Sequence, residues 1–411
     1  MMDTENFVII GAGHAGGVAV QAMRGAGHEG SITLIGDETH LPYERPPLSK
    51  ELLQAVGGEG FRTMRDEAYY AENDVTLMLG VKATTIDAQK QTIALSTGNS
   101  LPYDKLLLTT GGDVRKLSIP GADLDGIHYL RTLDDSRAIE ALLKENANLV
   151  VVGGGFIGLE VAASARKRGA NVTVMEAMAH LMGRALPGDI SAMFLDLHSE
   201  NGVNVRLNDG VQAFLGDGHV DGIETSAGET IAADAVIVGV GIIPETALAE
   251  SAGLTLDNGI IVDEFARTSN ANIYAAGDNT NHFNPLLDRH IRLEAWQNAQ
   301  NQAATAARNM CGANEVYAET PWMWSDQFDA NLQLAGLPST WGEMIYRGDI
   351  ASRDFIGFQL KDDMIEAAIA VNRPRDMRVA RRLMDGNARV STADIGNEDI
   401  SLRDILKSAT G

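Results

Sequence analysis

The stretch LVVVGGGFIGLEVAA, residues Leu149–Ala163, decides the fold of this 411-residue chain. Its four apolar residues predict a buried strand. Gly153, Gly155 and Gly158 follow as GxGxxG, and an apolar-periodic run then predicts a helix. In such a turn the first glycine permits the bend, the second lets the backbone approach a pyrophosphate, and the third lets the helix pack on the strand. Glu176 stands eighteen residues after Gly158, where a ribose-binding carboxylate belongs. A plain strand–helix turn is the alternative, but this spacing favours a dinucleotide site.

The same pattern occurs a second time near the N-terminus. The apolar run Asn6–Ile10 leads into Gly11, Gly13 and Gly16, again as GxGxxG, and Asp37 follows Gly16 by twenty-one residues. Two complete fingerprints predict two bound dinucleotides. FAD and a nicotinamide nucleotide are the economical pair, because a flavin can accept the hydride that a nicotinamide delivers.

Composition narrows the class of protein. The net charge of −23 argues against general binding to nucleic acid or acidic membranes. We find no uncharged apolar run long enough to cross a membrane and no basic secretory signal, so we expect a cytoplasmic protein. Cys311 is the single cysteine, which excludes an intramolecular disulfide, a cysteine-ligated iron–sulfur cluster and a Cys-X-X-Cys redox pair. We expect no metal site.

The segment LPYERPPLSK, residues Leu41–Lys50, is the next candidate site. Its adjacent prolines predict an extended turn before a helix that begins near Leu48. Arg45 and Lys50 would place positive charge beside the pyrophosphate and the flavin. The alternative is a pair of solvated surface cations.

The second half of the chain completes the two units and adds a third. Asp278 follows a predicted strand and Gly277, and could accept hydrogen bonds from sugar hydroxyls or act as an N-cap. A long helix is predicted over about Glu294–Met310. Beyond Pro321 the pattern becomes α+β, with a hairpin and a basic helix. The strands of this hairpin are Phe355–Leu360 and Met364–Val371, and the arginines of the helix are Arg373, Arg375, Arg378, Arg381 and Arg382.

Ordered motifs along nearly the whole chain resemble the ferredoxin reductases of bacterial haem-monooxygenase and aromatic-ring dioxygenase systems. They are VIIGAGHAG, IGDE, PYERPPLSK, LTTGG, YLRTLDD, VVVGGGFIGLEVAA, GVGIIPE, IYAAGD, RLEAWQNA and PWMWSDQ. The resemblance implies an α/β fold like that of glutathione reductase, with two Rossmann-like dinucleotide-binding domains and a C-terminal α+β interface domain. The implied domains are FAD-binding (1–115 and 246–320), NAD-binding (116–245) and interface (321–411).

The resemblance also implies the cofactor contacts. FAD would be held by Gly11, Gly13, His14, Ala15, Asp37, Arg45, Lys50, Ala83, Arg131, Asp278 and Trp296, with Ala83 and Trp296 acting through their backbones. NADH would be held by Gly153, Gly155, Ile157, Gly158, Glu160, Glu176, Arg184 and Gly241.

Three residues are implied to serve the chemistry directly. Glu160 would hydrogen-bond the nicotinamide amide, although it could instead be a solvent-facing acid of the first helical turn. Lys50 would lie near flavin N5 and favour the anionic reduced flavin. Trp324 would contact the flavin or lie on the electron path, or it could be a core residue, which is the interpretation we favour for Trp322. Glu176 would repel the 2′-phosphate of NADPH, so we expect NADH to be preferred.

The implied activity is that of an NADH-dependent ferredoxin reductase. Hydride would pass from NADH to FAD, and single electrons would pass to a two-iron two-sulfur ferredoxin serving a cytochrome P-450 type haem monooxygenase or an aromatic-ring dioxygenase. Docking would use a local basic patch, with Arg62, Arg65, Arg308 and the Arg373–Arg382 helix as candidates, although each could be a solvated surface charge. The alternatives are another acceptor, such as rubredoxin, a quinone or monodehydroascorbate, or an NADH-sensing interaction flavoprotein.

Overall fold

The computed structural model describes residues 5–55, 57 and 61–410, in two compact units. Unit 1 comprises Met1–Arg45, Arg62–Asp113 and Ile243–Pro321, and unit 2 comprises Pro46–Phe61, Val114–Ile242 and Trp322–Gly411. The chain passes between the units five times, and two of these passages lie within β8 (Gly112–Val114) and β17 (Ile242–Pro244). Among the described residues, every helix is too short or too polar to traverse a bilayer.

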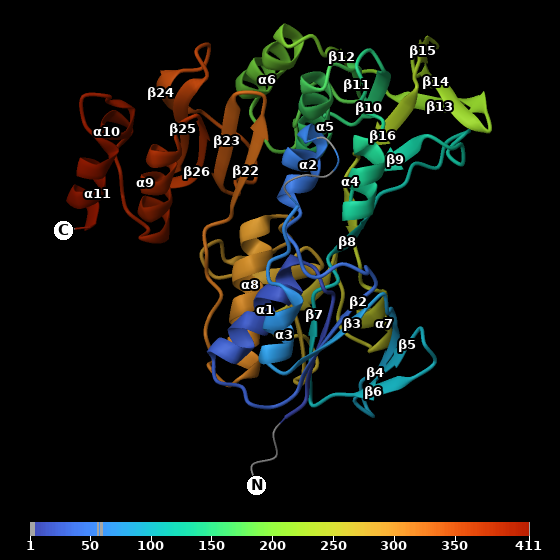
Figure 1. The fold of residues 1–411 in the computed structure, drawn as a ribbon. Helices are drawn as coiled ribbons and strands as arrows, with labels where there is room; N and C mark the ends of the chain where they lie inside the picture. Colours follow the sequence, from blue (N-terminus) through green and yellow to red (C-terminus); the bar gives the residue numbers. More distant parts are fainter. Residues whose placement is uncertain (1–4, 56, 58–60, 411) are drawn as a thin grey trace. The chain divides into compact units, whose positions relative to one another are not determined.

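Unit 1 is built on a five-stranded parallel sheet in the order β19-β7-β1-β2-β3 (Figure 1). Phe7 pairs with Ile32 on one side and with Lys105 on the other, so β1 is central, and its side chains are buried. Such fully buried parallel strands explain the unbroken apolar runs in the sequence. The strands are β1 (Phe7–Ile10), β2 (Ile32–Gly36), β3 (Val75–Leu79), β7 (Lys105–Leu108) and β19 (Ile273–Ala275).

Helices and two small sheets complete unit 1. Helices α1 and α8 lie side by side and pack into one apolar cluster with one face of the sheet (Figure 1). The helices are α1 (His14–Gly25), α3 (Glu67–Glu72), α7 (Ala247–Ser251) and α8 (Trp296–Met310). The small sheets are β4 (Ala83–Asp87), β5 (Thr92–Leu95) and β6 (Ser100–Pro102), and β18 (Ile260–Val262), β20 (Thr280–Asn284) and β21 (Arg289–Ile291).

Unit 2 repeats the parallel sheet, in the order β12-β11-β10-β16-β9, with β10 central. The predicted duplication is therefore present in the fold. The strands are β9 (Ile127–Tyr129), β10 (Asn148–Val152), β11 (Asn171–Glu176), β12 (Asn204–Leu207) and β16 (Ala235–Val238). The helices are α4 (Leu133–Glu140), α5 (Phe156–Lys167) and α6 (Gly188–Glu200), and a small sheet consists of β13 (Val211–Asp217), β14 (His219–Thr225) and β15 (Thr230–Ala232).

The helix expected near Leu48 differs from the prediction. Residues Pro46–Ser49 form a short 3-10 helix, and α2 (Glu51–Gln54) follows after Lys50. Lys50 N donates to the Pro47 carbonyl oxygen at 3.1 Å, and this bond between residues three apart closes the tighter turn before α2 begins. The helix expected from Glu294 begins two residues later, at Trp296.

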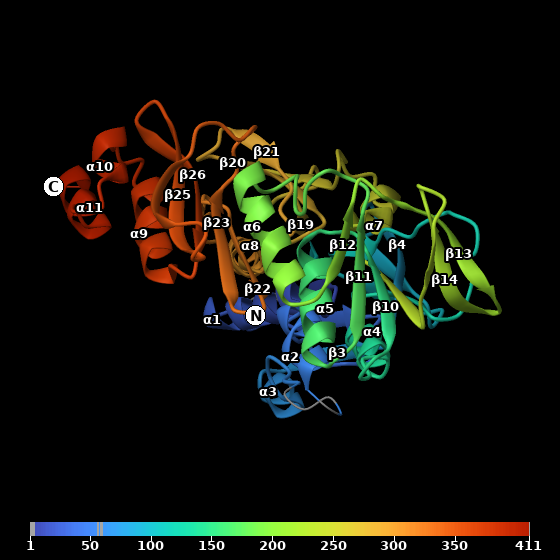
Figure 2. The same cartoon turned by 90° about the horizontal axis from the view of Figure 1, so that it is seen from above.

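The C-terminal part of unit 2 is an antiparallel sheet, in the order β22-β23-β26-β25-β24, and three helices (Figure 2). The predicted hairpin is confirmed as β25 and β26. Both faces of the sheet are buried. Ile369 and Val371 join the core of α5 and α6, while Ala368 and Ala370 join the core of α9. The elements are β22 (Trp322–Gln327), β23 (Ala330–Gly336), β24 (Ile345–Asp349), β25 (Asp354–Lys361), β26 (Met364–Val371), α9 (Pro374–Asp385), α10 (Thr392–Gly396) and α11 (Leu402–Thr410).

Candidate functional site

The glycine loop of unit 1 joins β1 to α1 and has the geometry of a pyrophosphate cradle. Gly11 has φ +113°, and a Cβ there would lie 2.2 Å from the Thr109 carbonyl oxygen. A Cβ at Gly16 would lie 2.0 Å from the Gly11 oxygen. At Gly13 the nearest atom is a guanidinium nitrogen of Arg45, 3.8 Å from where a Cβ would lie. The first and third glycines are thus required by packing, whereas the second faces a position beside a positive charge.

Arg45 is held beside this loop by its neighbours. Its guanidinium lies 3.0 Å from Glu38 Oε1 and 5.6 Å from the centre of the Tyr43 ring. A cation at this place, next to the free N–H groups of a helix N-terminus, favours an anion.

His14 and Trp296 meet at the starts of α1 and α8. Their ring centres lie 5.0 Å apart. His14 is buried and neither ring nitrogen has a hydrogen-bond partner among the described residues. Burial lowers its pKa from 6.5 to about 4, so the imidazole is neutral at pH 7. Buried polar atoms are normally paired, so the unpaired nitrogens fit a site that a polar ligand completes.

The remaining FAD candidates occupy several positions. Asp278 follows β19 and Gly277, where a Cβ on Gly277 would lie 3.8 Å from Ala15 Cβ, close to the start of α1. It precedes β20 rather than a helix, so the N-cap alternative is wrong. Asp37 is exposed just beyond β2, and Ala83 is buried at the start of β4. Arg131 belongs to unit 2, where its N–H donates to Asp135 Oδ2 at 3.0 Å.

The glycine loop of unit 2, between β10 and α5, repeats this geometry. Gly153 has φ +109°, and a Cβ there would lie 2.4 Å from the Gly239 oxygen. A Cβ at Gly158 would lie 2.1 Å from the Gly153 oxygen, but a Cβ at Gly155 would have no atom of the described residues within 4 Å. The backbone at Gly155 is therefore open to a ligand, as the fingerprint predicts.

Glu176 is fixed against this loop from the end of β11. Its Oε2 accepts a hydrogen bond from Gly154 N at 2.8 Å, and its Oε1 accepts one from Met178 N at 2.7 Å. Other NADH candidates surround the same edge. Ile157 is 47% exposed in the first turn of α5, and Arg184 is exposed in the segment after β11. Gly241 has φ +97°, and no atom in the part of the chain that the structure describes lies within 4 Å of a Cβ added there.

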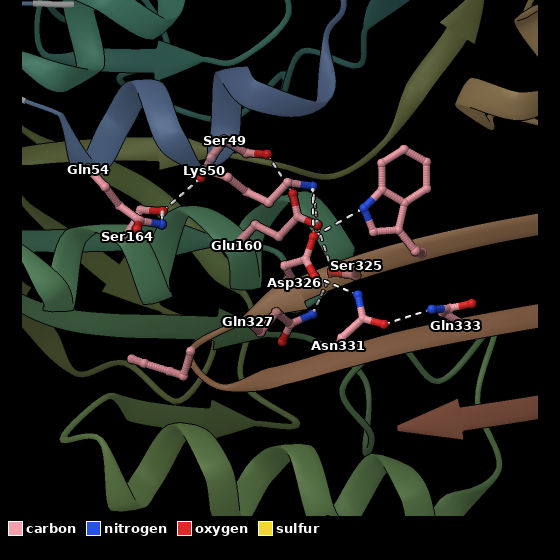
Figure 3. Close-up of polar contacts among 12 residues, drawn as sticks. Ser49, Lys50, Gln54, Glu160, Ser164, Ser325, Asp326, Gln327, Asn331 and Gln333 are labelled. Carbon is pink, nitrogen blue, oxygen red and sulfur yellow. Dashed lines mark hydrogen bonds and ion pairs between the residues drawn. The ribbon is translucent and has the colours of Figure 1, made fainter. Parts of the chain in front are cut away.

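Glu160 lies on α5 but points inward, with 3% exposure (Figure 3). Its Oε1 accepts a hydrogen bond from Ser325 Oγ at 2.6 Å, and its Oε2 accepts one from Ser49 Oγ at 2.5 Å. Burial raises the pKa of Glu160, while the Lys50 ammonium and the two hydroxyls act in the opposite direction. The solvent-facing alternative is therefore wrong.

Lys50 lies between two carboxylates and an aromatic ring. Its Nζ is 3.5 Å from Glu160 Oε1, 3.8 Å from Asp326 Oδ2 and 5.4 Å from the centre of the Trp324 ring. The residue is 7% exposed, so it is not a solvated surface cation.

Trp324 and Trp322 form a stack on β22. Their ring centres are 5.3 Å apart and their planes are inclined by 22°. Trp324 Nε1 donates to Asp326 Oδ2 at 3.1 Å. The Arg381 guanidinium of α9 lies 5.1 Å from the centre of the Trp322 ring. Trp322 also packs against the apolar core of α9, in line with the core interpretation.

Comparison with known proteins agrees with this arrangement. Residues 5–303 match the family model described as pyridine nucleotide-disulphide oxidoreductase, and residues 322–406 match the model described as reductase C-terminal. This chain belongs to the pyridine nucleotide-disulphide oxidoreductase family.

This oxidoreductase resembles individual proteins over nearly its whole length. It is 44% identical to the anthranilate 1,2-dioxygenase system ferredoxin–NAD(+) reductase component of Burkholderia cepacia, covering 98% of this chain and 100% of that one. It is 36% identical to putidaredoxin reductase of Pseudomonas putida, covering 100% and 98%. The crystal structure of a covalent putidaredoxin reductase–putidaredoxin complex matches with a TM-score of 0.95 and 36% identity, covering 99% of each chain.

This oxidoreductase has no cysteine pair, in spite of its family's name. Cys311 is its single cysteine, half-buried at the end of α8, and burial raises the pKa of its thiol. Within the described ranges, no three His, Cys, Asp or Glu side chains gather in a way that would hold a metal ion.

The candidate docking cations of this oxidoreductase lie in both units. Arg308 pairs with Glu315 at 2.6 Å, and Arg65 donates to Gln21 at 3.0 Å, both in unit 1. Arg62 also lies in unit 1 and is exposed. On α9, by contrast, an exposed basic face is present. Its members, here called the α9 basic face, are Arg375, Arg378 and Arg382.

Sequence reasoning missed the partners of Glu160. Ser49 and Ser325 lie within the PYERPPLSK and PWMWSDQ motifs, but nothing in the sequence assigns them to Glu160. Ser49 is 111 residues away and Ser325 is 165 residues away, so local spacing carries no signal of the contact.

Proposed function

We propose that this chain is an NADH-dependent ferredoxin reductase that binds FAD and passes single electrons to a two-iron two-sulfur ferredoxin. The ferredoxin would in turn serve an aromatic-ring dioxygenase or a haem monooxygenase of the cytochrome P-450 type. The family assignment and the names of relatives, such as the ferredoxin–NAD(+) reductase component of an anthranilate dioxygenase system, support this proposal.

The observation that carries the proposal is the duplicated open glycine loop together with the absence of a second cysteine. In each loop, no backbone atom or apolar side chain of residues 5–55, 57 and 61–410 lies against the middle glycine. The chain offers one thiol in total, so no protein dithiol is available to take electrons from a flavin. An external acceptor is then required.

The residues around the unit 1 loop fit the FAD pyrophosphate and its flanking groups. Gly11 and Gly13 shape the loop, and Arg45 supplies positive charge beside it. The unpaired nitrogens of His14 offer a further polar contact. The other proposed FAD contacts are Ala15, Asp37, Lys50, Ala83, Arg131, Asp278 and Trp296. When bound, FAD would accept a hydride from NADH and pass on its two electrons one at a time.

The residues around the unit 2 loop fit NADH. Gly153, Gly155 and Gly158 shape the pyrophosphate position, and the Glu176 carboxylate would accept the ribose hydroxyls and repel a 2′-phosphate. Ile157, Arg184 and Gly241 are proposed to complete the contacts.

Glu160 and Lys50, which are buried together in unit 2, would act on the nicotinamide end of the nucleotide. Glu160 would accept a hydrogen bond from the nicotinamide amide and so orient the hydride-bearing face. The Lys50 ammonium favours the charged form of Glu160, opposing the effect of burial, and, by the family resemblance, would stabilise negative charge that the flavin gains on reduction. No protein nucleophile is required.

Ferredoxins are generally acidic, and this chain has a net charge of −23, so the two proteins would repel each other overall. Docking would therefore need a local basic patch, and we propose that the α9 basic face is that patch. Trp324 would carry or contact the outgoing electron, since it lies between Lys50 and Trp322 in the stack that reaches Arg381.

We also propose the domain division and the compartment. Along the sequence, residues 1–115 and 246–320 would form the FAD-binding domain, residues 116–245 the NAD-binding domain inserted between them, and residues 321–411 the interface domain. The protein would work in the cytoplasm.

One experiment tests the proposed function. The purified protein, supplied with FAD, is mixed anaerobically with NADH, and the flavin absorbance is followed before and after addition of a two-iron two-sulfur ferredoxin. We expect bleaching with NADH and reduction of the ferredoxin. Protein that stays colourless, or that reduces ferricyanide but no ferredoxin, contradicts the proposal, and reduction of rubredoxin or a quinone in place of ferredoxin would favour the alternative acceptor. Slow bleaching with a long-lived charge-transfer band and dimerisation would instead favour an NADH-sensing role.

A further inference from the structure

A buried histidine lies at the end of a hydrogen-bond chain that leads to Glu160. His198, on α6, is 0% exposed, and its Nε2 lies 2.9 Å from Gln327 Oε1. Gln327 Nε2 donates to Ser325 Oγ at 3.1 Å, and Ser325 Oγ donates to Glu160 Oε1 at 2.6 Å. Figure 3 shows the inner links of this chain. None of the residues between His198 and Glu160 is exposed to solvent.

Each link has a defined direction. The amide nitrogen of Gln327 faces two acceptors, Ser325 Oγ and the Met182 sulfur at 3.7 Å. Its oxygen therefore faces His198 and needs a donor. A neutral imidazole meets that need only when Nε2 carries the proton. The other nitrogen, Nδ1, has no hydrogen-bond partner among the described residues, which agrees with this tautomer.

The direction continues to the carboxylate. Ser325 has one hydroxyl hydrogen. Because its oxygen already accepts from Gln327, the hydrogen is directed to Glu160 Oε1. If the Gln327 amide turned over, its oxygen would compete for that hydrogen and Glu160 would lose a donor. The charged groups that face Glu160 are Lys50, before α2, and Asp326, on β22.

We infer that His198 is a positioning residue for Glu160: it fixes the orientation of Gln327 and thereby holds Ser325 as a hydrogen-bond donor to the carboxylate. This inference rests on the proposed contact of Glu160 with the nicotinamide amide. Burial lowers the pKa of His198 to about 4, so the imidazole is neutral at pH 7.

The test compares three variants of the full-length protein. His198→Leu removes the N–H at similar volume. His198→Gln retains an N–H donor with similar reach. The matched control is His282→Leu, because His282 is 1% exposed in unit 1 and neither of its ring nitrogens has a described hydrogen-bond partner.

The first readout is the titration of the Glu160 carboxyl by infrared spectroscopy, with the band assigned by its loss in Glu160→Gln. A hydrogen bond to the carboxylate favours its charged form, so weakening that bond raises the pKa of Glu160 by about one unit. We expect this rise in His198→Leu, none in His282→Leu, and the original titration in His198→Gln. Histidine nitrogen NMR should show the neutral Nε2–H tautomer for the signal that His198→Leu removes.

The second readout is the rate of flavin bleaching by NADH, which we expect to fall about tenfold in His198→Leu and to recover in His198→Gln. An unchanged Glu160 titration in folded His198→Leu, or an Nδ1–H tautomer, overturns the inference. If His198→Leu does not fold, Gln327→Met, which cannot donate to Ser325, takes its place with the same expectations. The infrared titration needs no NADH, so a wild-type protein that NADH fails to bleach refutes the proposed function alone.

Discussion

At the scale of single residues, Glu176 shows how one carboxylate can serve both the fold and the ligand. Its two oxygens accept hydrogen bonds from Gly154 N and Met178 N, which hold it beside the glycine loop. An ionised carboxylate has about four lone-pair sites, so acceptor capacity remains for ribose hydroxyls.

Replacing this carboxylate should change nucleotide preference. We expect Glu176→Ser to raise the ratio of kcat/KM for NADPH to that for NADH about tenfold, which corresponds to about 1.4 kcal/mol of removed repulsion. Steady-state kinetics with both nucleotides measures it. The control is Glu72→Gln, which removes an exposed carboxylate in unit 1. An unchanged ratio would show that Glu176 does not select between the two cofactors.

At the scale of elements, the glycine loop between β10 and α5 contains glycines that the fold requires and one that it does not require. A Cβ on Gly158 would meet the Gly153 oxygen at 2.1 Å, but a Cβ on Gly155 would meet no described atom within 4 Å. We expect Gly158→Ala to lower the melting temperature by several degrees and Gly155→Ala to leave it unchanged while weakening NADH binding about tenfold. Thermal melts and NADH titrations check both, and a destabilised Gly155→Ala would refute the open-loop interpretation.

Helix α9 offers a prediction for the partner. Reversing two charges on the α9 basic face, as Arg375→Glu with Arg378→Glu, should lower ferredoxin reduction about tenfold at low salt, because steering between unlike charges is lost. Ferricyanide reduction should not change. The control Lys90→Glu alters a cation whose side chain is 79% exposed on the β4–β5 turn of unit 1. Equal loss in both variants would mean that α9 is not the docking surface.

At the scale of the whole molecule, buried histidines make stability depend on pH. Burial lowers the pKa of His282 from 6.5 to about 4, so between these values the unfolded chain binds a proton that the folded chain excludes. The stabilisation is complete above about pH 6.5 and falls by up to about 3 kcal/mol as the pH approaches 4. His14 and His198 act in the same direction. Denaturant unfolding from pH 7 to pH 4.5 should show this loss, and His282→Leu should make it shallower.

The duplicated fold was predictable from the sequence because its signals are local. Apolar strand, glycine turn and helix follow one another at both Gly11 and Gly153, and β25 and β26 follow from alternation across a short turn. The environment of Glu160 was not predictable, since its hydroxyl partners come from segments more than a hundred residues away. The tight turn at Pro46 was also misjudged, because proline spacing alone does not distinguish a 3-10 helix from an α-helix.

The burial of the C-terminal sheet on both faces has a practical consequence for anyone who shortens this protein. Leu332, Phe355 and Ile369 fill the same core as the α5 and α6 side chains. A protein truncated after Thr320 would therefore expose a large apolar surface on the nucleotide-binding part of unit 2. We expect the truncated protein to aggregate in inclusion bodies. Centrifugation of cell extracts, followed by assay of the soluble and insoluble fractions, would test this.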